Sequence, residues 1–256
     1  TGPETVEPAA QSCSEGSLAS SDSYRIFFQN LVDELVALYG IAAQRNGHLE
    51  EEIGLILVSR KQKGSRPFSR DRRGFVLSEG AGVIVLAAEE MLSRHGLRPR
   101  AEVMGVGWTS DAYHFTKPNP ETIIRGIREA ISDAGLLPED IRYVNAHGTS
   151  TPKGDLVEID CLRAVFGKQL EKIPVSSNKS QIGHTLGAAA AIEDALTIEG
   201  MQRGIILPTI NHRPDPRFSD IDCVPNEARR QRHDVVLSNA FGFGGTNCCI
   251  VFRGVS

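Results

Sequence analysis

VVLSNAFGFGGTNCCIVF, residues 235–252, joins two apolar runs through a glycine-rich turn. The runs 235–237 and 248–252 are short and rich in β-branched and aromatic residues, as in paired strands. Glycine permits backbone conformations that are closed to other residues, so the amides of 242–245 could converge on an oxyanion. A pair of phenylalanines beside glycines is also common as ordinary core and turn. The stretch therefore predicts two strands with a candidate functional loop between them.

Strand and helix patterns alternate along most of the remaining chain. Apolar residues recur at three- and four-residue spacing where we expect helices, whereas shorter apolar runs bounded by turns fit buried strands. The expected helices are 89–95, 120–134, 155–166 and 187–202. The expected strands before residue 235 are 83–87, 101–107, 143–146 and 175–177. This alternation predicts an α/β layer architecture with functional loops at strand ends.

The N-terminal quarter has a different composition. Residues 1–21 are rich in Ser, Glu, Pro and Gly without periodicity, which predicts little order of their own. From Asp22 the spacing changes to that of an amphipathic helix that Ser20 or Ser21 could cap and Gly47 could end. An apolar run within 52–59 is a plausible strand. We therefore divide the chain into an atypical segment, 1–65, with one amphipathic helix, and a main part, 66–256.

Composition excludes several classes of function. A formal charge of −4 gives no reason to expect nucleic acid, because binding to phosphates calls for a basic face. The five cysteines show neither metal-ligand spacing nor an even disulfide framework, so we expect no metal and a reducing, cytoplasmic compartment. No apolar run is long enough to span a membrane, and no secretion signal is visible. An acidic carrier protein could still dock on a local basic cluster, although a solvated loop is the alternative. That cluster is Arg66, Arg70, Arg72 and Arg73.

Two histidines stand out in the motifs NAHGTST, 145–151, and KSQIGH, 179–184. His147 directly follows an expected strand, and His184 directly precedes an Ala-rich helix, whose positive end disfavours an imidazolium. Two neutral imidazoles that face one carbonyl would stabilise the enolate left when a malonyl group loses carbon dioxide. Either histidine could instead be an ordinary loop residue. The pair predicts decarboxylation chemistry on a thioester.

Charged and hydroxyl side chains surround these histidines in the sequence. Lys179 lies five residues before His184, and Asp155 and Glu158 share one face of the helix after His147. We expect a network between the lysine and these carboxylates that orients the histidines, with surface ion pairing as the alternative. Thr149 and Thr151 offer hydroxyls to a polar arm such as pantetheine, but turn capping would explain either equally well.

From about residue 66 to 252 the chain resembles the C-terminal portion of a type II β-ketoacyl-acyl carrier protein synthase, a ketosynthase of the thiolase superfamily. The resemblance implies a thiolase-like layered α/β fold with one half essentially complete and the N-terminal half truncated. It also implies decarboxylative Claisen condensation of malonyl-ACP with an acyl thioester in fatty acid or polyketide synthesis. Besides the three motifs above, it rests on RPF at 66–68, GFVLSEGAG at 74–82, SDAYH at 110–114 and PTIN at 208–211.

The same resemblance implies roles for individual residues. His147 and His184 would be the catalytic pair and Lys179 their buried support, with Asp155 and Glu158 as partners of the lysine. Phe243 would be a gate and an oxyanion-hole donor. The residues expected to meet the substrate are Thr149, Thr151, Phe241, Phe243 and Gly244. No cofactor is expected, since the substrates are carried on the phosphopantetheine of acyl carrier protein. Expected partners are that carrier protein and a second copy or a sister ketosynthase subunit.

One part of the family pattern is missing. The family's nucleophilic cysteine would fall near residues 23–26, where this sequence has none, and Cys13 is the only upstream candidate. An alternative function is therefore a noncatalytic or decarboxylase-only ketosynthase partner that lacks the nucleophile. The retained His147, His184 and Lys179 favour an enzyme, because a pure binding module would not need them.

Overall fold

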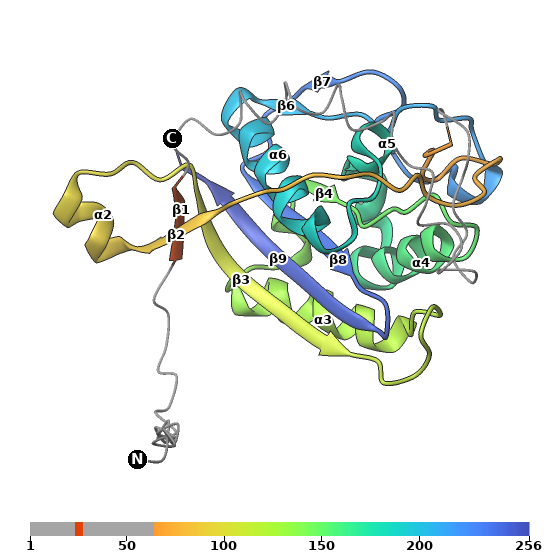
Figure 1. Cartoon of the computed structure of the whole chain (residues 1–256), viewed down its shortest axis with the longest axis horizontal. Coiled ribbons are helices and arrows are strands. Elements are labelled where there is room, and N and C mark those ends of the chain that lie inside the picture. The colour runs from red at the N-terminus through yellow and green to blue at the C-terminus, as the bar shows by residue number, and fades with distance from the viewer. Residues whose placement is uncertain (1–23, 28–63, 256) are drawn as a thin grey trace, which may run out of the picture.

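A mixed seven-stranded sheet forms the centre of the computed structural model, which describes residues 24–27 and 64–255 (Figure 1). The strand order is β2-β1-β3-β9-β8-β4-β5. β4 runs parallel to β5 and β8, and the other neighbours are antiparallel. The bounds of these strands are β1 Tyr24–Phe27, β2 Val85–Ala88, β3 Ala101–Ser110, β4 Tyr143–Asn145, β5 Val175–Ser176, β8 Val235–Phe241 and β9 Thr246–Gly254. A separate antiparallel pair joins β6, Ile205–Ile206, to β7, Arg229–Arg230.

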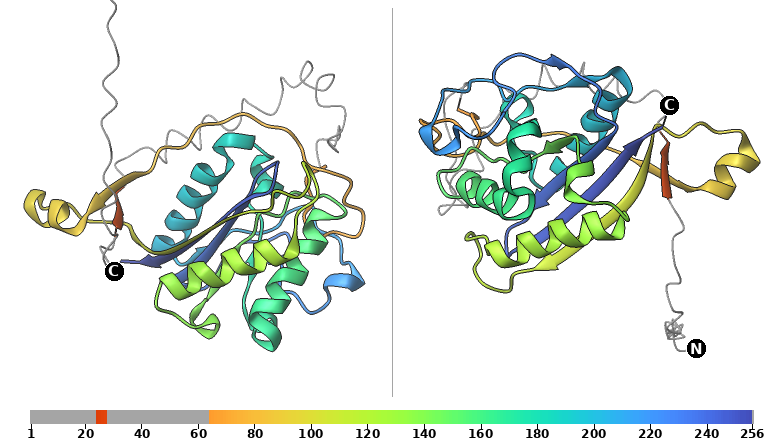
Figure 2. Two further views of the ribbon diagram at one scale, coloured as in Figure 1. Left: turned by 90° about the horizontal axis from the view of Figure 1, so that it is seen from below. Right: turned by 180° about the vertical axis from the view of Figure 1, so that it is seen from behind.

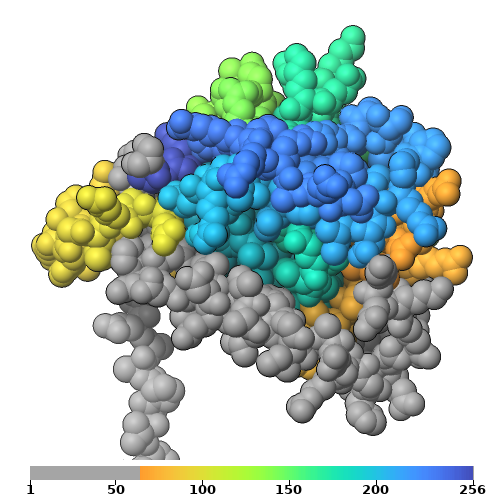
Figure 3. All heavy atoms as spheres, turned by 90° about the horizontal axis from the view of Figure 1, so that it is seen from above, coloured from red at the N-terminus to blue at the C-terminus, as the bar shows by residue number. Residues whose placement is uncertain are grey.

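Helices cover both faces of the sheet (Figure 2). α3 and α4 pack on one face, and α6 lies on the other, while α2 projects from one end of the molecule (Figure 3). The helices are α2 Glu89–His95, α3 Pro120–Asp133, α4 Gly154–Phe166, α5 Lys179–Ile182 and α6 Ala189–Arg203. Short 3-10 turns occur at Pro138–Asp140, Gly167–Lys172, Leu186–Ala188 and Pro216–Phe218.

The sequence explains where α3 begins and which face it buries. Asn119 accepts a hydrogen bond from the amide of Glu121, and Pro120 fills the first helical position, where no amide hydrogen is needed. One face of the helix is buried against the sheet, and its residues are Ile123, Gly126, Ile127, Ala130 and Ile131. The largest apolar cluster therefore lies between the sheet and the layer formed by α3 and α4.

Two glycines let β3 lie unusually close to α3. Gly105 and Gly107 alternate with outward-facing residues and are buried under the helix. A Cβ atom at Gly107 would overlap the carbonyl oxygen of Gly126 in α3, and one at Gly105 would overlap the backbone of Ala134. The absence of side chains at these two positions sets the distance between this helix and the sheet.

The three sequence motifs meet because of the strand order. β4, β5 and β8 are parallel neighbours, so their carboxyl ends lie at one edge of the sheet. The chain continues from these ends into His147, into α5 with Lys179, and into the turn 242–245. Loops at the carboxyl ends of parallel strands commonly carry binding sites, and here the topology brings together segments about 90 residues apart in sequence.

Most of the expected elements are present with small shifts of their ends. The expected strand 101–107 continues to Ser110, and the runs 235–237 and 248–252 extend to Phe241 and back to Thr246.

One prediction is wrong at its start: Tyr24–Phe27 is a strand paired with both β2 and β3, not the first turn of a helix. The rest of that helix and the expected strand in 52–59 lie outside the described residues. Pairing on both sides outweighs the local helical spacing.

Among the described residues, no helix is long and apolar enough to cross a lipid bilayer.

Gly107→Ala is expected to destabilise the protein by about 1–3 kcal/mol, because the added methyl group forces β3 and α3 apart. Urea denaturation would measure the change in the free energy of unfolding. Gly187→Ala is the matched control, since its added Cβ would meet no atom within 4 Å. Equal midpoints for Gly107→Ala and the parent would show that this helix is not held at the distance we infer.

Candidate active site

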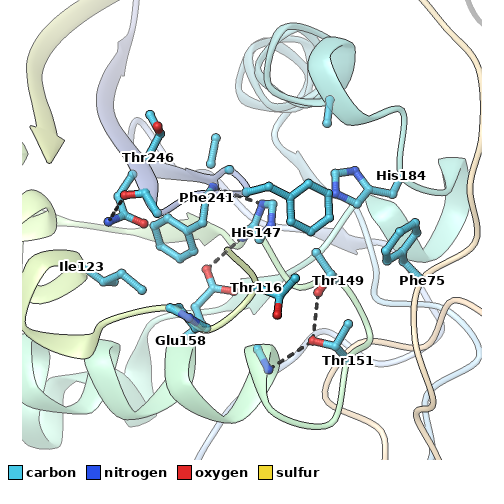
Figure 4. A pocket seen from close by; sticks show the side chains of 18 of the residues that line it. Phe75, Thr116, Ile123, His147, Thr149, Thr151, Glu158, His184, Phe241 and Thr246 are labelled. Atoms are coloured by element: carbon cyan, nitrogen blue, oxygen red, sulfur yellow. Dashed lines mark hydrogen bonds between the residues drawn. The ribbon is translucent and has the colours of Figure 1, made fainter. Parts of the chain in front are cut away.

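A cavity of about 730 Å³ lies where the three motifs meet (Figure 4). Its wall also includes part of the loop after β3 and the beginning of α6. The predicted site residues that line it are His147, Thr149, Thr151, Glu158, Lys179, His184, Phe241 and Phe243. Asp155 and Gly244 do not belong to its wall. The topology thus brings eight of the ten predicted residues to one space.

The two imidazole rings are in direct contact. Their centroids lie 5.6 Å apart with an angle of 84° between the ring planes. Nδ1 of His147 accepts a hydrogen bond from the amide of Phe241, and Nδ1 of His184 accepts one from the amide of Leu186, each at 3.3 Å. Because Nδ1 is the acceptor in both rings, each neutral imidazole carries its proton on Nε2. The cavity wall therefore contains two N–H donors of the same kind.

Both rings are held in their neutral form. Burial lowers the pKa of His184 to about 3, and the nearby ammonium of Lys179 acts in the same direction. Burial also lowers the pKa of His147 well below its usual value, and the ammonium of Lys179 and, whenever it is protonated, the ring of His184 act in the same direction. The predicted position of His184 beside a helix start is confirmed, because the amide of Leu186 at that start points at its ring. Near neutral pH both imidazoles are uncharged donors.

Lys179 forms a buried ion pair with Glu193. Its Nζ lies 2.6 Å from Oε1 and 2.8 Å from Oε2, and the two side chains are 1% and 2% exposed. The predicted direct ion pairs of Lys179 with Asp155 and Glu158 are not formed, although the charge of Lys179 still lowers the pKa of Glu158. Those carboxylates lie on α4, whereas α6 on the opposite face of the sheet presents Glu193 to the lysine. Two charges taken out of water together are tolerated because each satisfies the other.

Glu158 fixes the backbone around His147. Its Oε1 accepts a hydrogen bond from the amide of His147 and its Oε2 one from the amide of Gly148, both at 2.8 Å. The amide group of Asn239 donates a third, at 3.2 Å. Burial raises the pKa of Glu158, while these donors act against that rise. Glu158 therefore orients His147 through the main chain.

Asp155 lies outside the cavity wall and has a structural role. It accepts hydrogen bonds from the amides of Phe68 and Thr151 and lies 3.6 Å from Nε of the buried Arg72. Burial raises its pKa to about 7. Arg72 also contacts Asp215 at 3.0 Å. Asp155 thus ties the segment around residue 68 to the loop after β4.

The hydroxyl groups of Thr149 and Thr151 line the cavity and contact each other at 3.2 Å. Oγ1 of Thr151 also accepts a hydrogen bond from the amide of Gly154 at the start of α4. The capping alternative is therefore confirmed for Thr151. The contact between the two hydroxyls uses one of their hydrogens, so the other stays available to a ligand, and capping and binding are compatible.

The glycine-rich turn offers one free amide rather than several. The amides of Gly242, Gly244 and Gly245 donate to the carbonyl oxygens of Thr246, Phe115 and Gly242. The prediction that the amides of this turn converge on an oxyanion is therefore wrong for the three glycines. Within the part of the chain that the structure describes, the amide of Phe243 alone in this turn has no hydrogen-bond partner. Its ring stacks on Phe115, with centroids 5.4 Å apart.

Of the four cysteines in the described residues, only Cys248 lines the cavity. Burial raises the pKa of its thiol, so the thiolate is disfavoured. Cys13 lies outside the described residues. No group of three or more potential metal ligands gathers anywhere in residues 24–27 or 64–255. The described wall therefore offers two neutral imidazoles and the buried pair of Lys179 and Glu193, together with further charged side chains such as Glu158 and Lys117.

Sequence reasoning missed several residues of the wall. Glu193 was overlooked because nothing in its local sequence distinguishes it from a surface glutamate. Phe75 packs edge-on against His184, with centroids 5.0 Å apart. Phe115 and Lys117 follow the motif SDAYH, 110–114, which could have drawn attention to that loop.

The sequence profile described as β-ketoacyl synthase, C-terminal domain, matches residues 100–213. A 3-oxoacyl-[acyl-carrier-protein] synthase 2 of Coxiella burnetii is 42% identical over 196 residues, which are 76% of this chain and 47% of that protein. The protein of the same name from Staphylococcus aureus is 36% identical over 255 residues, covering 94% of this chain and 61% of the relative. The chain belongs to the β-ketoacyl synthase family.

Solved ketosynthases share the fold. A β-ketoacyl synthase from Burkholderia phymatum superposes with a TM-score of 0.75 at 36% identity, covering 83% of this chain and 52% of its own. A ketosynthase of a type II polyketide synthase, solved with its acyl carrier protein and a bound hexaketide, gives a TM-score of 0.77 at 32% identity. That match covers 81% of this chain and 52% of the other. The thiolase-like fold expected from the sequence is confirmed. The chain spans about half to three fifths of the length of these relatives.

Lys179→Met is expected to raise the pKa of both His147 and His184, because the ammonium lowers both. Histidine ring signals in NMR titrations would report the two values. Lys172→Met, at an exposed lysine, is the matched control and should leave both values unchanged.

The double variant Lys179→Met/Glu193→Gln separates the loss of the ammonium from the effect of an unpaired carboxylate. The single variant is expected to lose about 3–5 kcal/mol of stability and the double variant less, since it leaves no buried charge without a partner. Superimposable histidine titrations in Lys179→Met and the parent would contradict the electrostatic role of the lysine.

Proposed function

We propose that this chain provides the malonyl-decarboxylating part of a β-ketoacyl-ACP synthase, an acyltransferase. Its reaction is the decarboxylative Claisen condensation of malonyl-ACP with an acyl thioester, in fatty acid or polyketide synthesis. The observation that carries the proposal is the pair of neutral imidazoles in contact in one cavity, each with its proton on Nε2. The names of the relatives favour condensation over a noncatalytic role.

The two histidines act on the thioester carbonyl of the malonyl group. Their Nε2–H groups donate to its oxygen, so that negative charge develops where two donors already point. The bond between the α-carbon and the carboxylate breaks, carbon dioxide leaves, and the electron pair forms the enolate. The enolate carbon then attacks an acyl thioester and displaces its thiolate, or takes a proton to give an acetyl thioester.

Neutrality of the rings is essential to this mechanism. An imidazolium would pair with the malonyl carboxylate and stabilise the group that must leave uncharged, whereas a neutral donor favours the enolate oxygen. Burial and Lys179 keep the rings neutral, and Glu193 balances the charge of the lysine. The ion pair thus supplies a local field without adding net charge to the cavity.

The rest of the cavity suits a substrate on a long arm. Thr149 and Thr151 would meet the polar groups of pantetheine, and the free amide of Phe243 would donate to an oxyanion. Lys117 and Lys153 also line the cavity and would attract the phosphate of the arm. No cofactor beyond this carried phosphopantetheine is required by the proposed reaction.

Acyl carrier protein is the proposed partner, and the basic cluster divides into two kinds of arginine. Arg66 pairs with Asp71, and Arg72 is buried against Asp155 and Asp215, so these two support the fold. Arg70 and Arg73 are exposed and remain candidates for docking an acidic surface. Assembly as a homodimer or with a sister subunit stays a prediction.

His147→Ala is expected to reduce the release of carbon dioxide from malonyl-ACP by about 100-fold or more, because one of two fixed donors is lost. The assay would follow labelled carbon dioxide from malonyl-ACP that carries label in the free carboxyl group. His95→Ala is the control, since His95 is exposed on α2. Equal release by His147→Ala and the parent would sink the proposed role.

Arg70→Glu/Arg73→Glu is expected to weaken binding of acyl carrier protein about tenfold at low salt, through repulsion between like charges. Surface plasmon resonance at two salt concentrations would measure it. Arg98→Glu, at another exposed arginine, should bind like the parent. Identical affinities for all three proteins would exclude this docking site.

A further inference from the structure

A buried polar layer lies between the sheet and α6, beside the ion pair of Lys179 and Glu193. Successive residues of a strand point to opposite faces, so Ser238 of β8 faces α6 while its neighbour Asn239 reaches Glu158 on α4. Polar groups buried this deeply are stable only when each has a partner. The side chains that form the layer with the ion pair, each at most 6% exposed, are Asn145, Asn178, Asp194 and Ser238.

Hydrogen bonds join these side chains into one chain. The hydroxyl of Ser238 donates to Oδ1 of Asp194 at 2.6 Å, and Nδ2 of Asn145 donates to Oγ of Ser238 at 3.1 Å. Nδ2 of Asn178 donates to Oδ1 of Asn145 at 3.2 Å. The Asn145 side chain also hydrogen-bonds the carboxylate of Glu193. The chain of hydrogen bonds thus runs from one carboxylate of α6 to its neighbour, by way of β8 and β4.

The two carboxylates fix the direction of these hydrogen bonds. A carboxylate only accepts, and a serine hydroxyl has a single hydrogen, so Ser238 gives that hydrogen to Asp194 and its oxygen is left to accept. The amide nitrogen of Asn145 therefore faces Ser238, and its second N–H is the donor to Glu193. An amide turned by 180° would place its oxygen against the carboxylate of Glu193 and its NH2 group against that of Asn178.

Asn145 helps to keep Glu193 ionised. Burial raises the pKa of Glu193, and the charge of Lys179 and the hydrogen bond from Asn145 act against that rise. Protonation of Glu193 would leave the buried ammonium without a charged partner. The titratable groups whose charge acts on Glu193 or responds to it are Lys179 of α5, Glu158 of α4, Tyr143 of β4 and Asp194 of α6 itself.

We propose that Asn145 is a positioning residue, which holds the carboxylate of Glu193 against Lys179. Asp194, acting through Ser238, fixes the orientation of the Asn145 amide. The consequence for decarboxylation rests on the proposed function, because it passes through the ion pair to the histidines, whereas the consequence for Glu193 itself does not.

Ser238→Ala tests this relay without changing a charge or removing a group that touches Glu193. With no hydroxyl to fix the Asn145 amide, the pKa of Glu193 should rise by about 0.5–1 pH unit, the equivalent of one weakened hydrogen bond. Carbon-13 NMR titration of protein labelled at the glutamate carboxyl groups would measure it, and Glu193→Gln would identify the signal by its absence. Ser132→Ala, at an exposed serine of α3, is the matched control. Ser238→Thr retains the hydroxyl and should restore the parent value.

Two double variants keep the test decisive. Because Ser238→Ala leaves a buried carboxylate without its donor, Asp194→Asn/Ser238→Ala would be compared with Asp194→Asn, and the same rise is expected. Asn145→Ala/Ser238→Ala should give the same Glu193 pKa as Asn145→Ala alone, since the serine acts only through the amide. The proposal is overturned if the Glu193 pKa is unchanged in folded Ser238→Ala, or if the shifts of Asn145→Ala and Ser238→Ala add.

The pH dependence of decarboxylation separates positioning from a merely structural role. In Ser238→Ala the acid limb of the profile of carbon dioxide release should move to higher pH by the same amount as the Glu193 pKa, with KM unchanged. Release that is reduced equally at every pH would contradict the positioning role. The NMR measurement uses no malonyl substrate, so a parent chain that releases no carbon dioxide would contradict the proposed function alone.

Discussion

The ion pair between Lys179 and Glu193 is the interaction on which the site depends. Both groups are out of water, so each is tolerable only while the other is within contact distance, and loss of one would leave a charge that the protein interior cannot solvate. The pair joins α5 to α6 and so holds His184, which lies between them in sequence. The same ammonium lowers the pKa of both imidazoles. One contact thus fixes the position and the protonation state of the donors.

Carboxylates elsewhere in the site act through the main chain. Glu158 and Asp155 lie one turn apart on α4, but the first clamps the amides of His147 and Gly148, and the second those of Phe68 and Thr151. An amide held by a carboxylate cannot reorient without breaking a charge-assisted hydrogen bond. Gly148 has a φ of 34°, and a Cβ there would overlap Ser177, so the clamped turn also requires glycine. The position of the His147 ring is therefore set by the hydrogen bonds of its own main chain.

The sequence predicted those structural features that are determined by residues close together in the chain. Asn119 and Pro120 start a helix wherever that helix packs, and His184 precedes a helix start by two residues, so its contact with the amide of Leu186 follows from the sequence. Contacts between distant elements were not predictable in this way. Glu193 reaches Lys179, 14 residues away, only because α6 folds back beside the loop that follows β5, and the carbonyl oxygen of Phe115 accepts from the amide of Gly244, 129 residues further along the chain. The strand Tyr24–Phe27 likewise depends on two partners distant in sequence.

Burial lowers the pKa of the buried histidines and raises the pKa of buried carboxyl groups, and these opposite shifts limit the effect of pH on stability. His184, with a pKa of about 3 in the folded chain and about 6.5 when unfolded, takes up a proton first in the unfolded state. The contribution of neutral His184 to the free energy of unfolding is complete above about pH 6.5 and is lost as the pH falls towards 3. Burial raises the pKa of Asp194 to about 7, against about 3.9 when unfolded, so its contribution is lost as the pH rises between these values. Between about pH 4 and 6.5 the two slopes therefore oppose each other. Stability and chemistry do not conflict here: the neutral rings that the enolate requires are also the form that costs least to bury.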